Sequence, residues 1–183
     1  MLHLVPYFAL GLLLLGFIAA AIYTQLNSIR LNSRGWEQLL AQAAQIDFDG
    51  IKAVAQDYLD PQLEQIRLEP QDLWNLVGGY DGMRAMRANA KLMLALAAHA
   101  QHWNFVEATI VYERMRHDAL RLRAATFRIE LGLIPHFVMR RFWLRTPLYL
   151  QDATAAYYLM RQRLLALYAN NNSARYPRLA EVF

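Results

Sequence analysis

Histidine and glutamate recur at metal-ligand spacing on two consecutive stretches of the chain. His99 and His102 are three residues apart, and Glu113 and His117 follow four residues apart. A carboxylate-bridged di-metal site in a helical bundle needs Glu-x-x-His pairs on facing helices plus two further glutamates. Here the glutamate–histidine spacing is four, and the other glutamates of this region complete no second motif. These four residues are therefore weak metal candidates, ordinary polar positions are the simpler interpretation, and we expect no bound metal or cofactor.

A glycine-rich stretch, residues 78–82 (GGYDG), precedes Arg84, Arg87 and Lys91. A glycine turn that leads into a helix can hold phosphate on its backbone N–H groups, with arginines around it. However, the stretch matches neither GxGxxG nor GxxxxGK[ST], and no predicted strand precedes it. We favour a tight turn between two helices, followed by a solvated basic face.

Arginines form two rows in the second half of the chain. Arg114, Arg121 and Arg128 are seven residues apart, and Arg116 and Arg123 form a second row on the other side of the same predicted helix. A nucleic-acid surface gathers its cations and aromatics on one side, so nucleic acid is an unlikely partner. Asp118 is within helical reach of Arg114 and Arg121. The rows are thus interpreted as solvated or ion-paired flanks, with a surface for anionic lipid or nucleic acid as the alternative.

Residues 135–145 interleave arginines with aromatic side chains, which suits a segment at a lipid interface. The alternative is a short connecting helix whose aromatic side chains pack inward. The candidate membrane-interface residues are Phe137, Arg140, Arg141, Phe142, Trp143 and Arg145.

The elements that must position these residues are predicted to be helices. Apolar residues alternate three and four apart over about 104–134, and a second apolar stripe on that helix (Leu120, Ala124, Phe127, Leu131) predicts that it is sandwiched between neighbours as the spine of the domain. Two further apolar stripes with this spacing, called seams, are predicted. One lies in the helix after Asp81 (Met83, Met86, Ala90, Met93, Ala97, Ala100), and the other follows Thr146-Pro147 (Leu150, Ala153, Tyr157, Met160, Leu164, Leu167). The fold class is all-α: a transmembrane helix and then a soluble bundle. The predicted parts are an anchor (1–30), a helical stalk (31–46), a bundle (47–170) and a C-terminal tail (171–183).

The anchor is predicted from an uncharged start. Residues 1–29 contain no Asp, Glu, Lys or Arg, and the apolar run Leu4–Tyr23 would span about 30 Å as a helix, the thickness of a bilayer core. Arg30 and Arg34 follow the run, so we expect a single-pass protein with its N-terminus outside and its domain in the cytoplasm. A cleaved signal peptide ending near Ala21 is the alternative, but no basic residue precedes the run.

Composition limits the functions that remain. There is no cysteine, which excludes disulfides, thiolate metal sites and cysteine nucleophiles. The net charge is +4, made of −4 in residues 31–110, +7 in residues 111–183 and +1 from Arg30. We expect a non-enzymatic, membrane-tethered helical interaction module with a protein partner or self-association, and possible contact with anionic lipid. The alternative is a membrane-anchored helical-bundle enzyme or a metal- or cofactor-binding protein.

Overall fold

A computed structural model describes residues 15–16, 34–59, 69–133 and 146–183, and these residues form helices and no strand. The all-α class is therefore confirmed. The helices are α2 (Trp36–Leu40), α3 (Phe48–Leu59), α4 (Pro70–Leu76), α5 (Gly79–Ala100), α6 (Phe105–Leu133), α7 (Thr146–Asn171) and α8 (Tyr176–Val182).

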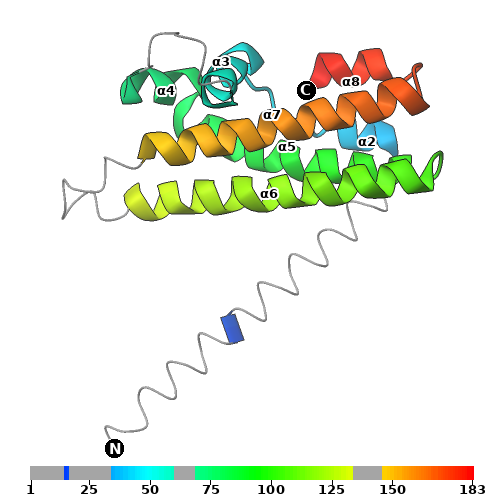
Figure 1. Ribbon diagram of the computed structural model, residues 1–183, viewed down its shortest axis with the longest axis horizontal. Helices are drawn as coiled ribbons and strands as arrows, with labels where there is room; N and C mark the ends of the chain where they lie inside the picture. Colours follow the sequence, from blue (N-terminus) through cyan, green and yellow to red (C-terminus); the bar gives the residue numbers. More distant parts are fainter. Residues whose placement is uncertain (1–14, 17–33, 60–68, 134–145) are drawn as a thin grey trace, which may run out of the picture.

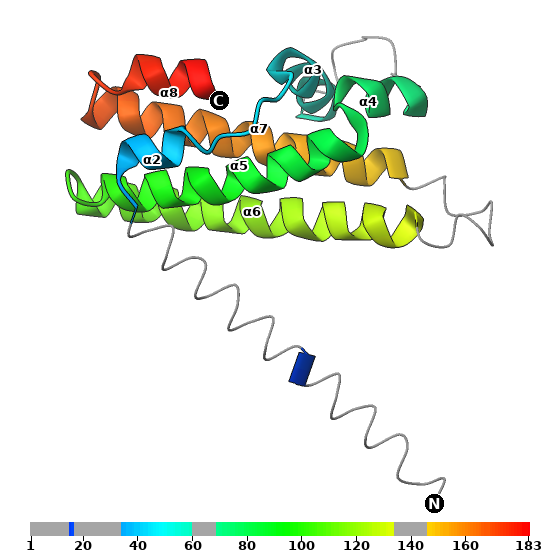
Figure 2. The same cartoon turned by 180° about the vertical axis from the view of Figure 1, so that it is seen from behind.

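Three long helices, α5, α6 and α7, make the body of the bundle, and α6 runs antiparallel to the other two (Figure 1). Seen from either side, α6 lies along one edge, while α3, α4 and α8 lie along the opposite edge (Figure 2). The helix α7 contacts α3, α4, α5, α6 and α8. The prediction that the helix at 104–134 is the spine was thus wrong, because α7 takes that central place.

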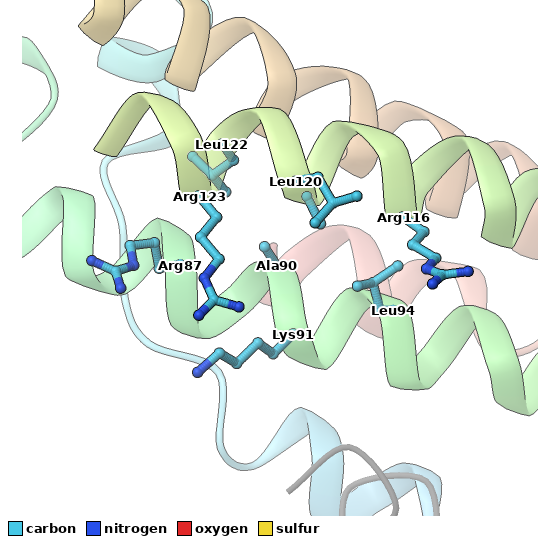
Figure 3. A pocket seen from close by; sticks show the side chains of 9 residues that line it. Arg87, Ala90, Lys91, Leu94, Arg116, Leu120, Leu122 and Arg123 are labelled. Carbon is cyan, nitrogen blue, oxygen red and sulfur yellow. The ribbon is translucent and has the colours of Figure 1, made fainter. Parts of the chain in front are cut away.

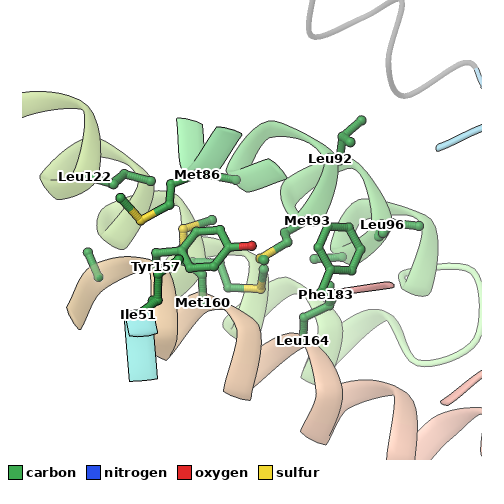
Figure 4. Packing of buried hydrophobic residues seen from close by; sticks show 14 of the residues in the cluster. Ile51, Met86, Leu92, Met93, Leu96, Leu122, Tyr157, Met160, Leu164 and Phe183 are labelled. Carbon is green, nitrogen blue, oxygen red and sulfur yellow. The ribbon is translucent and has the colours of Figure 1, made fainter. Parts of the chain in front are cut away.

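The core forms where the predicted seams of α5, α6 and α7 meet (Figure 4). Tyr157 and Met160 of α7 are fully buried there, together with Met86 and Met93 of α5 and Leu122 of α6. The α7 helix is buried on most sides along its middle, which explains why its sequence shows little segregation of apolar and polar faces. This burial confirms the prediction of which face of α5, α6 and α7 points into the core.

A capping aspartate and two glycines determine where α3 begins and where α4 gives way to α5. The Asp47 carboxylate accepts hydrogen bonds from the backbone N–H groups of Asp49 (3.1 Å) and Gly50 (3.2 Å), so it caps α3. Gly78 and Gly79 have positive φ angles of 76° and 61° between α4 and α5. Glycine adopts this left-handed conformation without steric cost, so the predicted tight turn is formed.

The structure differs from two predicted boundaries. The helical stalk expected over 31–46 is not formed in its described part, because α2 ends at Leu40 and buries Trp36 and Leu39 in the core. The Asn89 side chain then holds the chain after α2, donating to the carbonyl oxygen of Ala44 and accepting from its N–H, each at 2.8 Å. The expected C-terminal tail instead contains α8, whose Leu179 is fully buried.

Within the described ranges, no helix combines the length and apolar character needed to cross a bilayer. The predicted anchor Leu4–Tyr23 lies outside the described residues apart from positions 15 and 16.

Candidate functional site

The outer face of α6 carries an exposed apolar seam, here called the outer seam. It occupies positions 106, 110, 113, 117, 120, 124, 127 and 131, which alternate four and three apart over the length of the helix. Its large apolar members are between 48% and 69% exposed: Val106, Ile110, Leu120, Phe127 and Leu131. No described helix covers this face in either view of the molecule. The predicted sandwich was therefore wrong, because α5 and α7 both pack on the opposite seam of α6.

Arginines border the outer seam on both sides, and one row is engaged by α7. Arg121 pairs with Asp152 at 2.6 Å, and the guanidinium of Arg128 lies over the Tyr149 ring, 5.4 Å from its centroid. These contacts hold Arg121 and Arg128 of the first row against α7. The interpretation of the rows as ion-paired flanks is thus confirmed for Arg121.

The spacing of Asp118 within α6 suggested a pair with Arg114 or Arg121, but Asp118 pairs with neither of them. It is 3% exposed and forms an ion pair with Arg163 of α7. Burial lowers the pKa of the Arg163 guanidinium, and the nearby charge of Arg114 lowers it further. Sequence spacing within α6 could not reveal this partner, because the contact depends on how α7 packs.

The second row, Arg116 and Arg123, borders a pocket between α5 and α6, called here the α5–α6 pocket. Its volume is about 230 Å³. Its lining comprises four cationic side chains around an apolar floor and no acidic side chain: Arg87, Ala90, Lys91, Leu94, Arg116, Ala119, Leu120, Leu122 and Arg123. Figure 3 shows the Arg123 and Lys91 side chains converging from the two helices, with Arg116 near Leu94 and Leu120 at the other end.

Charge compensation in the α5–α6 pocket is uneven. Arg87 forms an ion pair with Glu130 across the two helices. Arg116 has only a 3.5 Å contact with Glu113, and both side chains are exposed, so this pair adds little. Among the described residues, no carboxylate lies within salt-bridge distance of Lys91 or Arg123. The pocket therefore retains a positive potential.

The weak metal candidates are not brought together. Within the part of the chain that the structure describes, no group of three His, Asp or Glu side chains is placed to hold a metal ion. Glu113 and His117 are exposed on the outer seam, whereas the His99 ring makes edge-to-face contacts with His102 and Trp103, at 5.5 and 6.0 Å between centroids. Burial lowers the pKa of His99, as do the nearby His102 and Arg175.

Two predicted features remain: the glycine-rich turn with the basic residues that follow it, and the membrane-interface candidates. The glycine turn serves to connect α4 and α5, while Arg87 and Lys91, which follow it by sequence, line the α5–α6 pocket. The membrane-interface candidates at 137–145 lie outside the described residues.

Buried polar groups stabilise the bundle away from this site. The Tyr157 hydroxyl accepts a bond from the Asn89 amide (3.4 Å), and the Tyr168 hydroxyl donates to the Leu96 carbonyl oxygen (3.0 Å). Burial raises the pKa of each tyrosine to about 12, because the phenolate would lose its hydration. These groups stabilise helix packing and do not face the α5–α6 pocket.

Comparison of this chain with protein-family models, with curated protein sequences and with solved structures found no match.

Proposed function

We propose that this chain is a helical interaction module, held at a membrane by Leu4–Tyr23, that binds one amphipathic helix of a partner protein on the outer seam. The partner helix carries acidic side chains beside its apolar stripe. The single observation that supports this proposal is the exposed four-three seam of α6 between two rows of arginines. An exposed apolar patch of this kind on a folded domain is typical of an interaction site.

The narrowness of the outer seam favours a helix over a lipid surface. A helix that lies in a bilayer interface buries a wide apolar face, whereas a seam of a and d positions alone is the pattern of paired helices. The outer seam is interrupted at its middle by Glu113 and His117. A polar pair at such positions suits a partner helix that supplies polar groups in register, and it disfavours insertion into hydrocarbon.

Charge favours a different chain over a second copy. Positions beside the seam set partner choice in paired helices, since like charges there repel. Arg114, Arg121 and Arg128 lie on one side of the outer seam, and Arg116 and Arg123 lie on the other. A second α6 would therefore bring arginine rows together in either orientation, whereas glutamates beside the partner's seam would pair with them.

The membrane part of the proposal rests on the sequence of residues 1–34. The absence of charge before Arg30 and the two arginines after the apolar run support an N-out, single-pass, cytoplasm-facing arrangement. A phosphatase reporter fused after Phe183 is expected to be inactive, because this enzyme needs the oxidising side of the membrane. An active reporter would contradict the orientation.

The docking test uses the full chain in non-ionic detergent and two designed helical peptides. Both peptides carry leucine at a and d positions, and they differ only in having glutamate or lysine at the flanking positions. We expect the acidic peptide to bind and the basic peptide not to. Phe127→Glu should abolish binding, whereas Leu59→Glu, at a 44% exposed site on α3, should leave it unchanged.

A photo-crosslinker at position 120 separates the possible occupants in native membranes. A product with another polypeptide whose crosslinked segment is an acidic amphipathic helix would support the proposal. Crosslinks mainly to lipid, or to a second copy of this chain, would overturn it. Equal binding of the acidic and basic peptides would also overturn it.

A further inference from the structure

We propose that the α5–α6 pocket binds the phosphate group of a small phosphomonoester or of a lipid headgroup. This ligand site differs from helix docking on the outer seam, although Leu120, Arg116 and Arg123 border both. Lys91 and Arg87 of α5 belong to the pocket alone, whereas Phe127 belongs to the outer seam alone.

The charges of the pocket point to an anion. Four cationic side chains line it and no acidic one does, and Glu130 compensates only Arg87. Lys91 from α5 and Arg123 from α6 converge on the space between the helices (Figure 3). Their like charges repel until an anion lies between them, so ligand binding relieves an unfavourable interaction.

The residue types favour phosphate among anions. A guanidinium can donate two parallel hydrogen bonds to phosphate oxygens, and an ammonium acts as a point charge beside it. Arg123 and Lys91 together supply that combination from two rigid helices. Because both side chains are exposed, they can reorient around a ligand without breaking a contact of the core.

Size and lining limit the rest of the ligand. At about 230 Å³ the pocket is smaller than the roughly 300–1,000 Å³ typical of sites for drug-sized ligands. Its floor is apolar, formed by Ala90, Leu94 and Leu122. The site therefore suits one phosphate with a short aliphatic part, such as a glycerol phosphate unit, and is too small for a nucleotide.

The experiment uses the full chain in nanodiscs of neutral phosphatidylcholine. One arm titrates glycerol 3-phosphate by calorimetry, and the other compares nanodiscs with and without phosphatidic acid by phosphorus NMR. Lys91→Gln should weaken binding about tenfold, the loss expected for one charge-assisted hydrogen bond. Arg84→Gln is the matched control, because it removes one exposed positive charge from the same helix at a position that does not line the pocket.

The outcomes assign the source of the phosphate. If glycerol 3-phosphate binds and the binding depends on Lys91, the ligand is a soluble phosphomonoester. If instead only phosphatidic acid shows a Lys91-dependent broadening of its phosphorus signal, the ligand is a lipid headgroup. Either result supports the site. No binding in either arm, or equal losses in Lys91→Gln and Arg84→Gln, would overturn it. So would a Lys91 requirement seen only with the acidic helical peptide, because the pocket would then hold a partner's carboxylate. Phe127→Glu should leave phosphate binding intact, which separates this inference from the docking proposal.

Discussion

Two leucines of α6, only two residues apart, provide the most direct test of how the helix is oriented. Leu122 is 1% exposed in the core between α5, α6 and α7, whereas Leu120 is 58% exposed on the outer seam. Leu→Ala is the same chemical change at both sites. Any difference in its effect on stability therefore reports the environment of the side chain.

The expected cost of Leu122→Ala has two parts. Three carbon atoms leave the core, which at about 0.8 kcal/mol each removes roughly 2.4 kcal/mol of transfer free energy. The cavity left behind adds to this, so the total free energy of unfolding should fall by about 2–5 kcal/mol. Leu120→Ala should change it by no more than about 0.5 kcal/mol, the range typical of surface sites.

Thermal unfolding of the full chain in non-ionic detergent, followed by far-UV circular dichroism, measures both variants. For a chain of this size the core substitution should lower Tm by roughly 4–20 °C, and the surface substitution by about 2 °C or less. Similar losses for the two variants would refute the placement of the outer seam. A larger loss for Leu120→Ala would show that another part of the chain covers it.

Two further outcomes follow from particular contacts. Gly82→Ala should lower the free energy of unfolding by about 1–3 kcal/mol, because a Cβ there would overlap the carbonyl oxygen of Val77. Gly35→Ala, where an added Cβ has no neighbour within 4 Å, should be nearly neutral in the same thermal assay. Comparable effects of the two substitutions would contradict the close approach of the Gly82 and Val77 backbones. The free energy of unfolding should fall as pH rises from 10 to about 12. The unfolded chain ionises its tyrosines near pH 10, whereas Tyr157 and Tyr168 stay protonated in the folded protein up to about pH 12. Each of these two tyrosines should therefore account for a loss of up to about 2.7 kcal/mol. The double variant Tyr157→Phe/Tyr168→Phe should flatten this alkaline slope in denaturant titrations. An unchanged slope in the double variant would contradict the raised pKa values.

The helices of this protein, and the inward face of each long helix, follow from the spacing of apolar residues along the chain. A four-three repeat of apolar residues predicts a helix with one apolar face. The predicted seams of α5 and α7 are buried, and the predicted seam of α6 is buried between Ala108 and Ile129 except at the half-buried Tyr112 and Ala119. The tight turn at Gly78 and Gly79 was also predictable, because the conformational freedom of glycine acts locally.

Which of the two apolar stripes of α6 is covered depends on how the helices pack together. The second stripe of α6 has the same spacing as the first, so periodicity could not distinguish a face awaiting a partner from a face packed inside the fold. The same limit hid the α5–α6 pocket, whose Lys91 and Arg123 are 32 positions apart and meet only because two helices pack side by side. It also hid the Arg163–Asp118 pair and the burial of α2. Residue spacing along one helix determines which side chains lie on the same face of that helix. The neighbours of that face come from distant parts of the chain, so they depend on how the helices pack.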